Sequence, residues 1–232
     1  MSNNRILLIV GVIFALLVVV GVLASVTAFV VFSDSGPNLF GERAIAEDTF
    51  LSLQDEFVVL VDDLPHIYFT NAGMEKPFSN REVILEMGVA TGKAYVKATN
   101  RITGYQTNLH RKDNTDISPA VIASTVSLFG SNEGALLALS EDWFPAYLEE
   151  DDPPEFLDED CDLGDACILY MYKEYDPVAQ VTRVRYEVAF VYKNVLVWVA
   201  AAGLDIDHDE TYVMDAAQAI FDRLEEAELV KQ

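Results

Sequence analysis

The chain has 232 residues, 51% of them hydrophobic, and its 38 acidic against 15 basic side chains give a formal net charge of −23. No basic stretch in the sequence could replace the counterions that condense on phosphates, so the composition excludes a general nucleic-acid-binding protein.

One long apolar segment lies near the N-terminus. Residues 6–32 are 27 positions without a charged side chain, and about 20 are enough to cross a bilayer. This length favours an uncleaved transmembrane signal anchor, although residues 26–28 (Val-Thr-Ala) leave a cleaved signal peptide as the alternative. Arg5 precedes the segment and acidic residues follow it, so we expect a cytoplasmic tail at 1–5 and a single pass through the cell membrane.

The rest of the chain is then expected to be extracytoplasmic. Residues 33–41 contain Gly and Pro and predict a short linker, and residues 42–232 have the length of one domain. Because Arg5 is the only charged residue in the first 32 positions, the outward part carries −24. Such acidity is typical either of a high-salt habitat or of a protein with a cationic partner.

Cys161 and Cys167 are the two cysteines of the chain. An even pair on the oxidising side of a membrane favours a disulfide that closes a small loop. A zinc site or a redox-active pair is the weaker alternative, because such sites use closer cysteine spacing.

The hydrophobic pattern predicts helices and strands in a fixed order. In the first third of the domain we expect a helix over 42–63 ended by Leu64-Pro65, a short strand over 67–70, a capped helix over 79–86, and turns at 71–73 and 88–92. In the remainder we expect antiparallel strands over 103–110 and 121–129, a helix over 131–144, strands over 168–172, 181–192 and 195–202, and a last helix starting at Asp209 or Thr211. These elements predict an α+β domain with helices packed on a mainly antiparallel sheet.

Short stretches in this order resemble a group of proteins. They are Leu64-Pro65, Ser79–Val83, Arg101–Tyr105, Val126–Phe129 with Glu133–Ala135, Leu163–Asp165, Tyr186–Phe190 and Val195–Val199. Over residues 60–229 the chain resembles a loosely defined group of exported or membrane-anchored bacterial proteins of unknown function, whose α+β domains are similar to extracytoplasmic sensor domains. The resemblance implies a fold and a location but no catalytic residues. Such proteins often have Arg-Gly-Asn between the last two strands, whereas this chain has Tyr192-Lys193-Asn194.

Two acidic segments are candidates for weak calcium binding. The segment 149–165 has ten carboxylates in 17 residues, and calcium prefers six to eight oxygen ligands from a flexible loop. Asp205, Asp207 and Asp209 imitate the start of an EF-hand loop, but Glu210 replaces the glycine that such a loop needs. The alternatives are a solvated loop for the first segment and helix capping for the second.

Catalytic motifs are missing from the sequence. His66, His110 and His208 are scattered, and neither a nucleophile elbow nor a phosphate-binding glycine loop occurs. Aromatic residues at even steps on the strands predict one aromatic face, either a core or a ligand cavity; they are Tyr170, Tyr172, Tyr186, Phe190, Tyr192 and Trp198.

The sequence therefore favours a non-catalytic, membrane-tethered binding or sensor-like domain with no tightly bound cofactor. Its partners would be the bilayer, through residues 6–32, and other membrane proteins. An accessory subunit of a larger membrane complex and a hydrolase with an unmarked site are the alternatives.

Overall fold

The computed structural model describes residues 44–64, 68–70, 75–111, 119–140, 143, 154–158, 161–177, 179–205 and 209–229. Residues 43–232 belong to one compact unit. The predicted anchor at 6–32 and linker at 33–41 lie outside the described residues. Within the described residues, no helix is both long and apolar enough to span a membrane.

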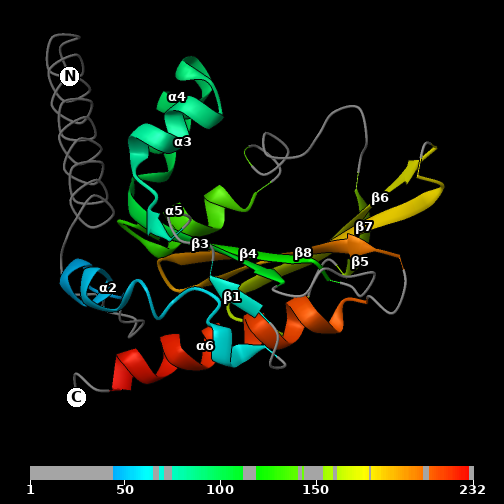
Figure 1. The fold of residues 1–232 in the computed structure, drawn as a ribbon. Helices are drawn as coiled ribbons and strands as arrows, with labels where there is room; N and C mark the ends of the chain where they lie inside the picture. Colours follow the sequence, from blue (N-terminus) through cyan, green and yellow to red (C-terminus); the bar gives the residue numbers. More distant parts are fainter. Residues whose placement is uncertain are drawn as a thin grey trace, which may run out of the picture. The chain divides into compact units, whose positions relative to one another are not determined.

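The described part is an α+β domain built on one antiparallel sheet of eight strands (Figure 1). Along the sheet the order is β1-β3-β4-β8-β7-β6-β5, and β2 pairs with β3. The strands are β1 (Tyr68–Thr70), β2 (Lys76–Pro77), β3 (Arg101–Arg111), β4 (Val121–Phe129), β5 (Glu155–Asp158), β6 (Ala166–Asp176), β7 (Val181–Tyr192) and β8 (Val195–Leu204). The helices are α2 (Glu47–Leu53), the short 3-10 helix η1 (Val61–Asp63), α3 (Asn80–Glu86), α4 (Val89–Thr99), α5 (Asn132–Ala138) and α6 (Thr211–Leu229). The predicted α+β domain, with helices packed on an antiparallel sheet, is confirmed.

Helices cover both faces of the sheet. Figure 1 shows α6 on one face and α3, α4 and α5 on the other. The stripe of α6 is fully buried at Val213, Ile220 and Leu224, and it packs in the larger core with side chains such as Val188 and Val197. A second core lies on the other face and includes Phe78, Val83, Tyr95, Phe129, Ala135, Tyr170 and Val191.

The hairpin between β7 and β8 forms as predicted. Lys193 takes a left-handed φ of 53° in its two-residue turn. The buried side chain of Asn194 accepts from the Ile45 N–H at 2.6 Å and donates to the carbonyls of Ile45 and Phe129 at 3.0 and 2.9 Å. One asparagine therefore joins the hairpin to β4 and to the start of the described chain.

The prediction of a helix over 42–63 is wrong for most of that range. Helix α2 ends at Leu53, and Phe57, Val58 and Val59 are buried at three consecutive positions. The Val59 N–H donates to Ser124 Oγ at 2.8 Å, so this segment bonds to the sheet rather than to a preceding helical turn.

The prediction of a turn at 88–92 is also wrong, because helix α4 begins at Val89. Gly88 is its N-cap at a φ of 79°, a conformation that glycine adopts without strain. A Cβ at Gly92 would lie 2.5 Å from the backbone of Ile84, so this glycine allows α3 and α4 to pack closely.

Helix α3 begins as predicted. Ser79 Oγ accepts from the Glu82 N–H, and the Glu82 carboxylate accepts from the Ser79 N–H at 2.7 Å, which completes a capping box. These bonds to Ser79, first the backbone bond and then the side-chain bond, lower the pKa of Glu82. Helix α5 also begins at its predicted cap, Ser131, but it ends at Ala138 instead of reaching 144.

Candidate functional site

A cavity of about 460 Å³ opens on the face of the sheet that carries the second core. We call it the polar cavity. It is lined by Phe78, Glu86, Tyr95, Arg101, Gln106, Asn108, Ala123, Thr125, Ser127, Ala138, Tyr170, Arg185, Glu187, Ala189, Leu196 and Trp198. Its volume falls within the range of about 300–1,000 Å³ that is typical of small-molecule sites.

Strand register explains why these side chains meet. Residues directly opposite one another in antiparallel strands point to the same face of a sheet. One row across the sheet runs Gln106, Thr125, Trp198 and Ala189, and the next runs Asn108, Ala123, Ala200, Glu187 and Tyr170. In the second row two small alanines stand between Asn108 and Glu187, and one of them, Ala123, lines the cavity.

Glu187 is the centre of a buried cluster, which we call the Glu187 cluster. Only 4% of the residue is exposed. Its Oε2 accepts from Tyr170 Oη at 2.5 Å and from Trp198 Nε1 at 2.7 Å, and Arg185 Nε forms an ion pair with Oε1. The Arg185 guanidinium also stacks on the Tyr172 ring, 4.4 Å from its centroid. The carboxylate charge is thus compensated inside the protein, which a buried charge requires.

The Tyr170 hydroxyl is held in its protonated form. Burial is the main cause that raises its pKa well above the ordinary value of 10.0, and the negative charge of Glu187 adds to the effect. Tyr170 therefore acts as a fixed hydrogen-bond donor to Glu187.

Arg101, which also lines the cavity, links β3 by hydrogen bonds to the start of α3 and to β4. The residue is only 4% exposed, and its guanidinium donates to the Phe78 carbonyl at 2.8 Å, to Asn80 Oδ1 at 2.7 Å and to Ser127 Oγ. Asn80 in turn donates to the Arg101 carbonyl at 2.9 Å. Gly104 leaves room for this guanidinium, because a Cβ there would collide with Arg101 Nη2.

Glu86 lies on the rim of the cavity at the end of α3, with its side chain largely exposed. Partial removal of water from its carboxyl raises the pKa of Glu86, against the smaller opposing effects of Lys76 and Arg101. The lining residues thus include two cations, Arg101 and Arg185, and two carboxylates, Glu86 and Glu187.

Other lining groups keep their hydrogen-bonding capacity. The Gln106 amide, the Thr125 hydroxyl and the two terminal nitrogens of Arg185 make no hydrogen bond to the rest of the described chain. Each is therefore available to water or to a ligand in the cavity.

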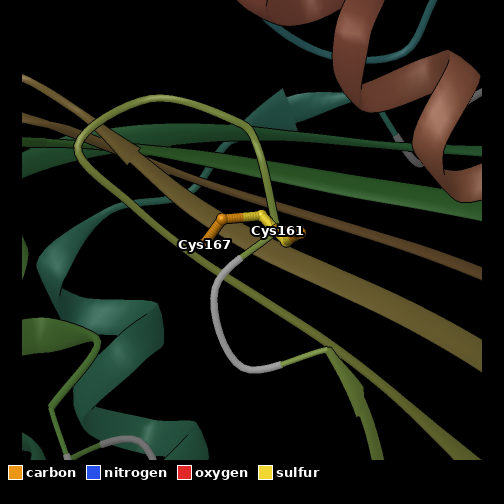
Figure 2. Close-up of a disulfide and its surroundings, with 2 residues drawn as sticks. All are labelled: Cys161 and Cys167. Carbon is orange, nitrogen blue, oxygen red and sulfur yellow. A yellow bond between two sulfur atoms is a disulfide. The ribbon is translucent and has the colours of Figure 1, made fainter.

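The predicted disulfide between Cys161 and Cys167 is confirmed, with the two Cα atoms 5.1 Å apart (Figure 2). It joins β6 to the segment that leads into it, and both cysteines are buried on the face that carries α6. Gly164, inside the loop, has a φ of 65°. The disulfide shapes the entry to β6 and is separate from the polar cavity.

The candidate calcium residues are only partly described. The Asp205 carboxylate lies 3.5 Å from Lys173 Nζ, and Asp209 Oδ1 accepts from the Thr211 N–H at 3.0 Å, which is a helix-capping role. Asp207 lies outside the described residues. In the described chain, no three metal-ligating side chains are grouped as a site. Part of the acidic segment 149–165 forms strand β5 instead of a loop. Calcium binding stays a prediction.

The single aromatic face predicted from the strands is wrong. Tyr170, Tyr172 and Trp198 lie on the face of the polar cavity, whereas Tyr186, Phe190 and Tyr192 pack with the core beneath α6. Even spacing holds within each strand, but the register between strands places the second set on the opposite face.

Sequence reasoning missed the polar residues of the cavity. In β7, charged residues alternate with apolar ones, as on a solvated face. The signal in the sequence is that Arg185 and Glu187 alternate in step with the apolar residues Ala189 and Val191, so their face of β7 becomes apolar toward its end.

No family model and no curated protein matches this sequence. Among solved structures, the fold is similar to the extracellular domain of PknH from Mycobacterium tuberculosis. The TM-score is 0.49 at 11% sequence identity, and the match covers 80% of this chain and all of that one.

Proposed function

We propose that this protein is a membrane-tethered, extracytoplasmic binding domain whose ligand occupies the polar cavity. The observation that carries the proposal is the cavity itself: a hollow of about 460 Å³ lined by both apolar and polar side chains, of which Arg101 and Glu187 are held in place by hydrogen bonds. This combination is typical of small-molecule sites, where polar groups fix the orientation of the ligand.

Binding fits the cavity better than catalysis does. The Glu187 carboxylate is already occupied by Tyr170, Trp198 and Arg185, and the Ser127 hydroxyl accepts from Arg101. A general base or nucleophile needs a free lone pair directed at the substrate. Glu187 and Ser127 therefore serve better to hold a molecule than to transfer its protons.

Two features support the location. The disulfide between Cys161 and Cys167 suits an oxidising compartment. The apolar segment at 6–32 has the length and the flanking charge of an anchor whose C-terminal side faces outward.

The test is to identify what the protein carries. Full-length protein is extracted from its native membranes in mild detergent, and the small molecules released on unfolding are identified by mass spectrometry. Ala123→Phe places a ring in the cavity, and Ala90→Phe places the same ring on the exposed surface of α4. A compound held by the wild type and by Ala90→Phe but lost from Ala123→Phe supports the proposal. Finding no bound compound, or equal retention by all three proteins, refutes it.

A second candidate is an accessory subunit of a membrane complex. Leu85 and Val89 lie on either side of the connection between α3 and α4 and are 63% and 56% exposed. In this role the two side chains would be covered by the partner protein. A membrane protein that co-purifies with the wild type, and is lost from the double variant Leu85→Ser/Val89→Ser, would support this role.

A further inference from the structure

We infer that the ligand of the polar cavity is a neutral saccharide. The inference rests on the proposed function, because it names the class of molecule that the cavity would take.

The charges of the cavity favour an uncharged ligand. Arg101 and Arg185 are balanced in number by Glu86 and Glu187, although the whole chain carries −23. Arg101 is further occupied by the Phe78 carbonyl and by Asn80 and Ser127. An anion would meet no excess of positive charge among these four groups. A cation would meet only the exposed carboxylate of Glu86, because Glu187 is already paired with Arg185.

The unoccupied polar groups exclude a purely apolar ligand. Within the described chain, the Gln106 amide and the Thr125 hydroxyl have no hydrogen-bond partner, and they lie directly opposite one another on β3 and β4. An apolar ligand would remove water from both groups without replacing its hydrogen bonds, which opposes binding.

These groups both donate and accept hydrogen bonds, as sugar hydroxyls do. The Arg185 terminal nitrogens add donors, and Glu86 on the rim adds an acceptor. A ligand with several hydroxyls around a ring can use donors and acceptors on different sides at once.

Trp198 places an aromatic ring beside these polar groups in the cavity lining. It is the cross-strand neighbour of Thr125, so an amide, a hydroxyl and an indole stand in one row across β3, β4 and β8. The indole N–H is bonded to Glu187 at 2.7 Å, which fixes the ring on the floor of the cavity while leaving it partly exposed. An aromatic face of this kind packs against the C–H face of a sugar, and the neighbouring polar groups reach its hydroxyls.

The test uses the full-length protein in detergent and a panel of probes. The neutral saccharides are glucose, maltose, trehalose and N-acetylglucosamine, and the comparison compounds are glutamate, lysine and decanoate. Binding is measured by calorimetry on the wild type and on Gln106→Leu, Thr125→Val, Thr125→Ser and Ala123→Phe. The control is Gln218→Leu, whose side chain is exposed on α6. We expect at least one saccharide to bind the wild type, Gln218→Leu and Thr125→Ser. Its affinity should fall at least tenfold in Gln106→Leu and in Thr125→Val.

The outcomes separate this inference from the proposed function. If a charged or apolar probe binds the wild type but not Ala123→Phe, and no saccharide does so, the saccharide class is wrong and the binding function stands. A saccharide that binds Gln106→Leu and Thr125→Val as well as the wild type also overturns the inference. If the panel gives no binding, the compound recovered from native protein decides: a compound that is not a neutral polyol overturns the class, and the absence of any compound overturns both proposals.

Discussion

Replacing Tyr170 by Phe tests whether the Glu187 cluster is a fixed part of the domain. Tyr170 is 2% exposed, and its hydroxyl donates to Glu187 at 2.5 Å and accepts from Trp198 at 3.2 Å. The substitution leaves the ring in place but takes one donor from a buried carboxylate. A hydrogen bond to a charged group contributes about 1.5–3 kcal/mol, so we expect the free energy of unfolding to fall by that amount.

This loss is large enough to measure in a thermal melt. For a domain of 150–250 residues, 1 kcal/mol corresponds to about 2–4 °C in Tm, so Tyr170→Phe should melt about 3–12 °C below the wild type. Circular dichroism of the full-length protein in detergent gives the Tm directly.

The control is Tyr175→Phe on the same strand. Tyr175 is 60% exposed, and surface substitutions of this kind usually change stability by no more than about 0.5 kcal/mol. If Tyr170→Phe and Tyr175→Phe melt at the same temperature, the hydrogen bond to Glu187 does not stabilise the domain and the reasoning is refuted.

Further predictions concern pH, a helix cap, the disulfide and the hairpin. Because the pKa of Tyr170 is raised in the folded state, its contribution to stability is complete below about pH 10 and is lost as the pH rises further. In urea unfolding at alkaline pH, the stability of Tyr170→Phe should therefore fall less steeply with pH than that of the wild type. Equal slopes for the two proteins would contradict this prediction. Ser79→Ala removes the cap of α3 and should cost about 1 kcal/mol by urea unfolding, whereas no change would show that the cap is dispensable. The double variant Cys161→Ser/Cys167→Ser opens a small loop and should lose about 2 kcal/mol, measured against wild type under non-reducing conditions; unchanged stability would count against the disulfide as a stabilising link. Asn194→Ala leaves three backbone groups without their partner and should cost about 2–4 kcal/mol, and a loss below 1 kcal/mol would mean that water replaces the side chain.

Much of the sheet could be predicted because its signals are local. The strands β7 and β8 are long and rich in β-branched and aromatic residues, and the turn at Lys193-Asn194 needs only two residues. Helix α6 carries an uninterrupted apolar stripe. Each of these elements follows from residues that are neighbours in the sequence.

Helix α4 was not predictable in the same way. Gly88 and Gly92 suggest a turn, and glycine inside a helix is unfavourable by about 1 kcal/mol relative to alanine. The structure shows that Gly92 is required by the close approach of the Ile84 backbone in α3. A tertiary contact therefore overrides a local preference.

The site depends on register, which the sequence does not display. Gln106, Thr125 and Trp198 come from three strands, and only the pairing of β3, β4 and β8 brings them into one row. Arg101 is similar, because its position at the start of β3 gives no hint that it will bind the Phe78 carbonyl and Asn80. Such residues can be recognised only once the strand order is known.

Native mass spectrometry of the intact full-length protein tests the central claim most directly. The wild type and Ala90→Phe, released from detergent under gentle conditions, should each show a species heavier than the bare chain by the mass of one small molecule. Ala123→Phe should show the bare chain alone, because its added ring fills the polar cavity. The same added mass on all three proteins would place the ligand elsewhere, and no added mass on any of them would contradict the claim that the cavity is a binding site.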